Sequence, residues 1–317
     1  MVDLKEHIDQ LAELIPDEPE KDLEEDPMEY QSLNLDVSGV PMLPNTIHKL
    51  RRLRHLSLPT QHCVKGDGKL KLQGLNELET IKWFSSWVDD ITHLLKLPKL
   101  QHLRAFICNE ESLLMIVDYA LNHQEQFREI QLVIEDGISL ENDGSSSSLL
   151  TKVLRIHSLC LLSIWCRVGK LPAYEIELCQ NLLTLNLEGC YIKEDPMKIL
   201  EKLPVLTSLR FQSHAYVGRK MVCSASGFPK LTELTLSSLR NLEEWRVEER
   251  AMPNLSRLII QVCVKLKMIP EGLKFITTLK QLAIGDMPNK FNDRLQVVDG
   301  KEGEDYYKIK HIPSILL

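Results

Sequence analysis

The sequence predicts an α/β solenoid, in which short repeats stack their strands into one parallel sheet. The main observation is the frame Leu-x-x-Leu-x-Leu, whose five clearest copies begin 24, 25, 24 and 24 residues apart. These copies start at Leu182, Leu206, Leu231, Leu255 and Leu279. A period of about 20 to 29 residues with this frame is typical of leucine-rich repeats. We therefore predict a leucine-rich-repeat solenoid, or horseshoe, over residues 30–288.

The frame also predicts which side chains form the core. Alternate side chains of a strand face opposite sides, so the two leucines of each Leu-x-Leu point inward and the residue between them points outward. Weaker copies of the frame extend the series towards the N-terminus, starting at Tyr30, Leu53, Leu78, Leu100, Phe127 and Leu159. We expect a concave parallel sheet of about eleven strands, with short helices or irregular segments on the convex side.

The two flanking segments depart from the repeat. Residues 1–29 contain twelve acidic residues and two lysines, a net charge of −10. Helical spacing of apolar residues predicts a short amphipathic helix over residues 3–15, followed by a solvated acidic linker or, as the alternative, a docking tail. Residues 289–317 are predicted to cap the solenoid, because an uncovered end would expose its leucine core.

Two longer insertions interrupt the period. Residues 110–121, EESLLMIVDYAL, have helical length and an acidic first turn, which predicts a convex helix. Residues 135–148 have the composition of a loop.

Charge and hydropathy narrow the classes of partner. The chain has 317 residues and a net charge of −7, of which the solenoid itself contributes +3. No concentrated basic stripe indicates a nucleic-acid binder, and no apolar run of about 18 residues indicates a membrane span. The N-terminus, MVDLKEHIDQ, lacks a secretory apolar stretch. We expect neither nucleic acid nor a membrane as partner, and a location in the cytoplasm, with the nucleus as the alternative.

The sequence contains no pattern typical of a catalytic or metal site. Neither phosphate-binding glycine motif is present, and the ten histidines include no H-E-x-x-H. His157, Cys160 and Cys166 lie in or beside one predicted strand, whose alternating geometry would not bring all three to one ion. We expect no catalytic residues, no cofactor and no metal, and therefore not an enzyme.

Three of the eight cysteines share a position in the repeat. Cys108, Cys190 and Cys263 follow the last residue of their frames by three positions, where leucine-rich repeats use Asn or Cys to satisfy backbone groups of the turn. We predict a structural turn ladder of reduced thiols.

The same register predicts a partner-binding surface on the concave side. The outward residues between the inward pairs include Lys82, Arg104 and Arg210. The next outward positions include Phe84, Phe106, Val133 and Trp165. Exposed aromatic residues beside cations are typical of protein-recognition hot spots. The alternative is that these frames are displaced by one residue, which would place the aromatic side chains in the core.

Several phrases of the chain resemble one family. They are LPNTIHKLRRLRHLSLP (43–59), LPVLTSLRF (203–211), GEDYYKIKHIPSI (303–315), and residues 227–288 with Gly-Phe-Pro, Leu-x-x-Trp and Cys-x-x-Leu-x-x-Ile-Pro. They resemble the leucine-rich-repeat half of plant intracellular nucleotide-binding immune receptors of the coiled-coil class. The resemblance implies recognition of pathogen effectors or guarded host proteins, and inhibitory contacts with a nucleotide-binding domain.

The chain departs from that family because it contains no phosphate loop and no nucleotide-binding module, so it cannot itself carry an ATP-dependent switch. It is a fragment, a truncated receptor or a stand-alone repeat protein. The expected partner is a protein: a pathogen effector, a guarded host protein, or a nucleotide-binding domain in cis or in trans. The alternative function is a general leucine-rich-repeat scaffold or adaptor, such as a phosphatase-regulatory or ubiquitin-ligase substrate-binding subunit.

Overall fold

The computed structural model describes residues 31–317, apart from residues 36–38, 67, 141–147, 174, 176–177 and 299. The chain forms two compact units, Met1–Val133 and Ile134–Leu317. The predicted N-terminal helix and acidic linker lie outside the described residues. The predicted domain boundaries at residues 30 and 288 stay a prediction.

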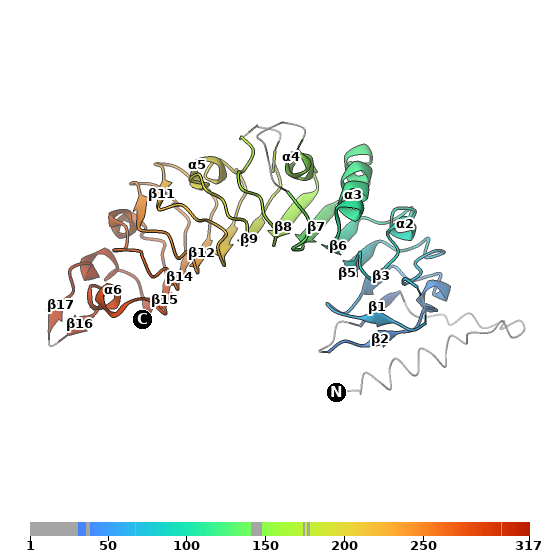
Figure 1. The fold of residues 1–317 in the computed structure, drawn as a ribbon, viewed down its shortest axis with the longest axis horizontal. Coiled ribbons are helices and arrows are strands. Elements are labelled where there is room, and N and C mark those ends of the chain that lie inside the picture. Colours follow the sequence, from blue (N-terminus) through green and yellow to red (C-terminus); the bar gives the residue numbers. More distant parts are fainter. Residues whose placement is uncertain are drawn as a thin grey trace, which may run out of the picture. The chain divides into compact units, whose positions relative to one another are not determined.

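The first unit is built on parallel strands that follow one another in sequence order (Figure 1). These strands are β1 (Ser32–Asn34), β3 (His55–Ser57), β5 (Thr80–Ser85), β6 (His102–Ile107) and β7 (Glu129–Ile134), the last of which ends on the first residue of the second unit. The returning segments hold the paired strands β2 (Met42–Leu43) and β4 (Cys63–Val64), the 3-10 helix η1 (Ile47–Lys49), α2 (Ile91–Leu94) and α3 (Glu110–Asn122).

The second unit repeats the arrangement with seven parallel strands. They are β8 (Leu159–Ile164), β9 (Thr184–Glu188), β10 (Ser208–Gln212), β12 (Glu233–Ser237), β14 (Arg257–Gln261), β15 (Gln281–Gly285) and β18 (Ser314–Leu316). Its other elements are α4 (Leu149–Leu154), α5 (Met197–Leu200), β11 (Lys220–Cys223), β13 (Glu244–Val247), η2 (Glu271–Phe275), α6 (Asn289–Asp293), β16 (Val297–Val298), β17 (Lys301–Glu302) and η3 (Tyr306–Lys308).

The register of the strands confirms the predicted frame. Leu209 of β10 pairs with Leu185 of β9 and with Leu234 of β12, and the ladder continues to Leu258 and Leu282. All five side chains are at most 3% exposed. Burying a leucine side chain stabilises a fold by about 1.5 to 3 kcal/mol, so each repeat depends on its neighbours to cover its inward pair. The predicted solenoid of parallel strands is confirmed.

The sheet has one strand more than the eleven frames found in the sequence, which agrees with the prediction of about eleven strands. Within the described residues the parallel sheet has twelve strands, because β18 of the predicted cap pairs with β15 and places Ile315 beside Leu282. A frame is present there, Ile312-x-x-Ile315-x-Leu317, but it starts 33 residues after Leu279. The 24-residue period does not predict this frame, because the interval before it is longer.

Helix α3 confirms the predicted convex helix. The Asn109 side chain accepts a hydrogen bond from the Ser112 backbone N–H at 2.8 Å, which caps the first turn. Leu113, Ile116 and Val117 form its buried face. Figure 1 shows α2 and α3 on the same side of the strands of the first unit, so neither of these two helices covers the other face.

A buried ionic cluster attaches the C-terminal segment to the last repeats. The Lys308 ammonium lies 2.8 Å from an Asp305 carboxylate oxygen and donates to the Ile269 carbonyl at 3.1 Å. Arg294 donates to both carboxylate oxygens of Asp305, at 2.7 and 3.1 Å. Burial favours the neutral acid, but the hydrogen bonds from Arg294 and Lys308 outweigh it and lower the pKa of Asp305.

We expect Asp305→Ala to destabilise the second unit by roughly 3 kcal/mol or more, because it leaves two cations without their buried partner. The measurement is the denaturant midpoint. Glu304→Ala is the matched control, since the Glu304 side chain is 76% exposed and also contacts Arg294. Because the pKa of Asp305 is lowered from its usual 3.8, its contribution is present at neutral pH and is lost as the pH falls through the folded-state pKa. Equal losses in the two variants would contradict this account.

Candidate partner-binding groove

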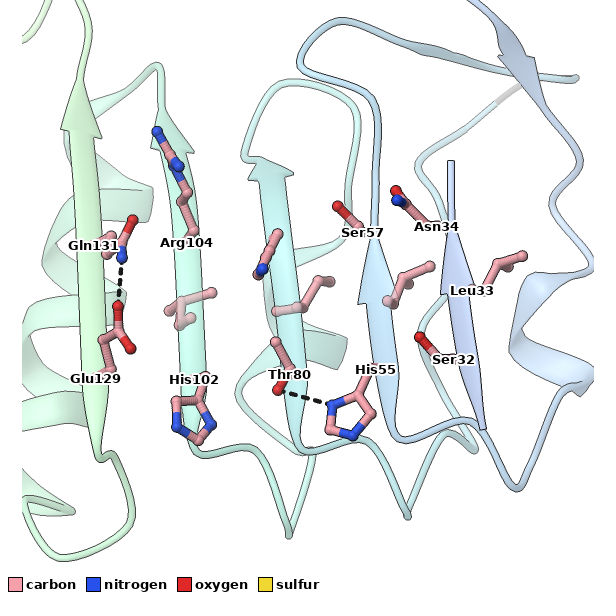
Figure 2. A pocket seen from close by; sticks show the side chains of 14 residues that line it. Ser32, Leu33, Asn34, His55, Ser57, Thr80, His102, Arg104, Glu129 and Gln131 are labelled. Atoms are coloured by element: carbon pink, nitrogen blue, oxygen red, sulfur yellow. Dashed lines mark hydrogen bonds between the residues drawn. The ribbon is translucent and has the colours of Figure 1, made fainter. Parts of the chain in front are cut away.

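The face of the first unit opposite α2 and α3 contains an open hollow of about 520 Å³, which we call the first-unit groove (Figure 2). Five neighbouring strands supply its fourteen lining residues: Ser32, Leu33, Asn34, His55, Leu56, Ser57, Thr80, Ile81, Lys82, His102, Leu103, Arg104, Glu129 and Gln131. The leucines and Ile81 belong to the inward ladder and their side chains are buried in the core, so the remaining ten polar side chains determine the chemistry of the groove.

One row of polar side chains crosses the groove at the beginning of the strands. Strand pairing places Ser32 beside His55, His55 beside Thr80, and Thr80 beside His102. The His55 Nδ1 atom lies 3.1 Å from the Thr80 hydroxyl, and Figure 2 shows both side chains directed into the groove. The sequence analysis missed this row, although the same alternation predicts that the residue just before the first inward one also faces outward.

A second row contains the predicted outward residues. Lys82 is exposed and Arg104 is half-buried, and both line the groove. Their part in binding a partner stays a prediction. Gln131 ends the row and donates a hydrogen bond to Glu129 (Figure 2). Arg210 belongs to β10 of the second unit, where it lies 3.7 Å from the Glu233 carboxylate. The predicted cations are therefore divided between the two units.

A β-bulge reshapes the centre of the groove. Ile81 pairs with Leu103 and Phe84 with Ala105, so both Lys82 and Trp83 lie opposite Arg104. Trp83 has a φ of 62°, and among the described residues it is the one non-glycine with positive φ inside a strand. Such a conformation costs about 1 to 3 kcal/mol and is found mainly at functional sites. It places the Trp83 ring 3.6 Å from the guanidinium carbon of Arg104.

Because of the bulge, one of the residues predicted to lie at the surface is buried instead. Because it adds a residue to β5, Phe84 takes the inward position assigned to Trp83 and is fully buried. Val133 is also buried, at 5% exposed, because the alternation of β7 ends in three consecutive buried residues, Leu132 to Ile134. Neither Phe84 nor Val133 is available to a partner. Phe106 is half-buried and Trp165, in the second unit, is 38% exposed, so both remain candidates.

The turn after β5 presents an aromatic side chain that the sequence analysis overlooked. Trp87 is 74% exposed. The turn is fixed from both sides, because Asp89 accepts the Ser85 backbone N–H at 2.6 Å and the Ser86 N–H donates to the Phe106 carbonyl at 3.0 Å. An exposed tryptophan on a fixed turn loses little conformational entropy on binding, which suits it to a protein contact.

Asp89 is itself held by a buried histidine. The His62 Nε2 atom lies 2.8 Å from an Asp89 oxygen, its Nδ1 lies 3.2 Å from the Pro59 carbonyl, and both side chains are fully buried. Burial opposes the charged imidazolium, but the hydrogen bond and negative charge of Asp89 outweigh it and raise the pKa of His62. The pair fastens the turn after β5 to the loop after β3.

Two members of the predicted turn ladder are arranged alike, and the third differs from them. The Cys190 thiol lies 3.5 Å from the Ile164 carbonyl, and the Cys263 thiol lies 3.6 Å from the Leu236 carbonyl. Burial raises the pKa of Cys263 to about 11, which keeps the thiol protonated and able to donate. Cys108 is half-buried, and its backbone N–H donates to the Ser86 hydroxyl at 2.9 Å. A structural role for the three thiols stays a prediction.

Metal ligands and membrane spans were also sought in the described part of the chain. Its His, Cys, Asp and Glu side chains form no group of three or more that could hold a metal ion. None of its helices combines the length and apolar character that crossing a bilayer requires.

Comparison with known proteins identifies the family. The model of the leucine-rich repeat region matches residues 28–292. The chain belongs to this family. It is 37% identical to "Probable disease resistance RPP8-like protein 2" of Arabidopsis thaliana over 89% of the chain, and 37% identical to "Disease resistance protein RPP8" of the same plant over 90%. Each match covers 30% of the relative, so this leucine-rich-repeat region spans about a third of the relatives' length.

These relatives confirm the resemblance to the repeat regions of plant disease resistance proteins. The crystal structure of a TLR13-ssRNA13 complex is also similar, with a TM-score of 0.41 and 15% identity over 90% of this chain and 50% of that one. Repeats of this kind present an extended surface for protein–protein interaction.

The bulge assignment predicts that the two outward-assigned residues of β5 behave differently. Phe84→Ala should destabilise the first unit by about 3 to 5 kcal/mol, as expected for removing a buried aromatic side chain. Lys82→Ala, two residues earlier and exposed, should change stability by less than about 0.5 kcal/mol. Thermal and denaturant unfolding of both variants measure this. If the Phe84→Ala chain were as stable as the parent, the burial of Phe84 would be contradicted.

The buried pair predicts a pH dependence for the first unit. Because the pKa of His62 is raised above its usual 6.5 in the folded state, the stabilisation is fully present below that value and declines as the pH rises through the folded-state pKa. We expect His62→Gln to remove this part of the pH dependence of the denaturant midpoint. His55→Gln, on the open face, is the control. A parent chain and a His62→Gln chain with parallel pH profiles would refute the assignment.

Proposed function

We propose that this leucine-rich-repeat region acts as the protein-recognition part of a plant immune receptor, and that the first-unit groove is its principal contact surface. The observation that carries the proposal is the groove itself: two polar rows, the exposed Lys82, and the strained Trp83 stacked on Arg104 all lie on one face. Trp87 adds an exposed aromatic side chain on the adjoining turn.

The layout of the groove favours binding over catalysis. Its polar groups are spread across five strands, and neighbouring strands lie about 4.8 Å apart. Nucleophilic or acid–base catalysis requires its reacting groups to converge on one point. A wide, open row of separate donors and acceptors instead suits an extended protein surface, in which a few aromatic and arginine contacts supply most of the affinity.

The proposed partner is a protein of the immune system: a pathogen effector, a guarded host protein, or a nucleotide-binding domain in cis or in trans. The similarity to disease resistance proteins supports this choice over a general scaffold or adaptor. The last of the three partners can be tested directly, because each relative extends well beyond the region that this chain matches.

The test fills the groove with a bulky side chain. Ser57 is the last residue of β3 and pairs with Asn34 on one side and Lys82 on the other, and Ser57→Trp adds volume without replacing a residue of the inward ladder. Thr235→Trp makes the same addition at the equivalent position of β12 in the second unit. The probe is the part of Arabidopsis RPP8 outside the matched region, produced with the chain and quantified by co-precipitation.

We expect Ser57→Trp to lower the co-precipitated fraction at least tenfold and Thr235→Trp to leave it near the parent value, with both chains folded by thermal denaturation. If the parent and Ser57→Trp chains co-precipitated the same fraction of the probe, the groove would not be the contact surface. No retention by the parent chain would contradict an interaction with a nucleotide-binding domain in trans.

A further inference from the structure

The turn after β5, residues 85–89, is hydrogen-bonded to the repeats on both sides of it. In the repeat that follows, the Cys108 backbone N–H donates to the Ser86 hydroxyl at 2.9 Å. In the segment that precedes β5, the Lys69 ammonium donates to the Ser86 carbonyl at 2.8 Å. Trp87 follows the residue that receives these contacts, and its own side chain is 74% exposed. The turn is therefore held at several points around one exposed indole.

The buried pair of His62 and Asp89 supplies a further attachment. One carboxylate oxygen of Asp89 accepts the Ser85 backbone N–H within the turn, and the other lies 2.8 Å from the His62 Nε2 atom. On the opposite side of the ring, the His62 Nδ1 atom lies 3.2 Å from the Pro59 carbonyl. The His62 ring is thus the link through which the loop after β3 holds the turn.

This link requires a proton. The Pro59 carbonyl can only accept a hydrogen bond, and so can an ionised Asp89 carboxylate. A neutral histidine beside a carboxylate carries one proton too few to make both contacts, whether the additional proton lies on the imidazole or is shared with Asp89. Without it, one ring nitrogen presents a lone pair to an oxygen atom, and that attachment is lost.

The surroundings of the pair favour keeping this proton. Burial opposes the charged imidazolium, but the hydrogen bond and charge of Asp89 raise the pKa of His62. Burial also raises the pKa of Asp89, and the Lys69 ammonium acts on Asp89 in the opposite direction. Asp90, the next residue, caps α2 and lies 3.6 Å from the His93 ring. The pair therefore holds its shared proton to a higher pH than a free histidine would.

We propose that His62 is a positioning residue for Trp87: the protonated pair fixes the turn in place, and loss of the proton releases the turn while the repeats stay folded. Neither His62 nor Asp89 belongs to the inward ladder, so the core does not depend on their link. A fixed, exposed indole suits an apolar pocket on a partner protein, because little conformational entropy is lost when it binds. Only this last consequence rests on the proposed function.

The first test measures hydrogen exchange at the Ser85 backbone amide, which donates to Asp89, in the full chain without a partner. Each rate is divided by the intrinsic rate at the same pH. We expect the amide to be protected at about pH 6 and about tenfold less protected at about pH 9, because the turn opens locally. His62→Ala should lose the protection at both values. His62→Gln keeps a donor towards Asp89 and does not titrate, so its protection should be equal at the two values.

Two controls separate positioning from general stability. The Val117 amide lies within α3 of the same unit and should keep its protection in every variant. His55→Ala, on the open face, should leave the Ser85 amide unchanged. Equal losses of protection at Ser85 and Val117 would show a general destabilisation and overturn the proposal. A Ser85 amide that responded neither to pH nor to His62→Ala would overturn it as well.

The second test observes Trp87 itself. Fluorine NMR of the chain labelled with 5-fluorotryptophan gives one signal for each tryptophan, and the Trp87→Phe variant assigns the signal of Trp87. This signal should change between the two pH values in the parent chain and stay constant in His62→Gln, whereas the signal of the buried Trp245 should stay constant in both. A Trp87 signal that did not follow the exchange of the Ser85 amide would contradict the positioning role.

Both measurements are independent of the RPP8 assay. If the parent chain retained none of the RPP8 probe, the interaction in trans would be contradicted, and the exchange and fluorine measurements would still decide whether His62 positions Trp87.

Discussion

The structure depends on the burial of the inward leucine pair of each repeat by the repeats on either side. No single strand of three to six residues could cover its own apolar side, and the ladder from Leu185 to Leu282 shows how each pair is completed by its neighbours. This constraint fixes the register of every strand in the regular part of the chain. Once the register is fixed, the outward positions are fixed too, and the polar rows of the groove follow from it.

The sequence was sufficient to predict what this constraint controls. Eleven strands, the convex helix after Asn109 and the outward direction of Lys82, Arg104 and Arg210 all follow from a period and an alternation that local residue types specify. The resemblance to plant disease resistance proteins was equally accessible, because the phrases that carry it lie in the most regular repeats.

The errors occur where the period or the alternation fails. An inserted residue has no signature in a strand whose neighbours Trp83 and Phe84 are both large and apolar, since either could fill the inward position. Val133 was misplaced because the end of β7 is buried on both faces. Ile315 was missed because the chain completes a helix, a hairpin and a 3-10 helix before returning to the sheet. Trp87 lies in a turn, where the position of a side chain depends on the distant pair of His62 and Asp89 rather than on strand alternation.

In a regular repeat, the pairing of a strand with its neighbours also fixes which of its residues face outward. The bulge in β5 preserves the pairing and changes the outward residues. On one side Ile81 pairs with Leu56 and Leu103, and beyond the bulge Phe84 pairs with Ala105, so the neighbouring strands keep their own frames despite the extra residue. The strand has absorbed an insertion within the sheet rather than in a loop. A repeat region that tolerates this can change the shape and chemistry of its binding face one residue at a time while its core stays closed. The same device, placed in another strand, would offer a direct way to engineer new contact surfaces on the scaffold.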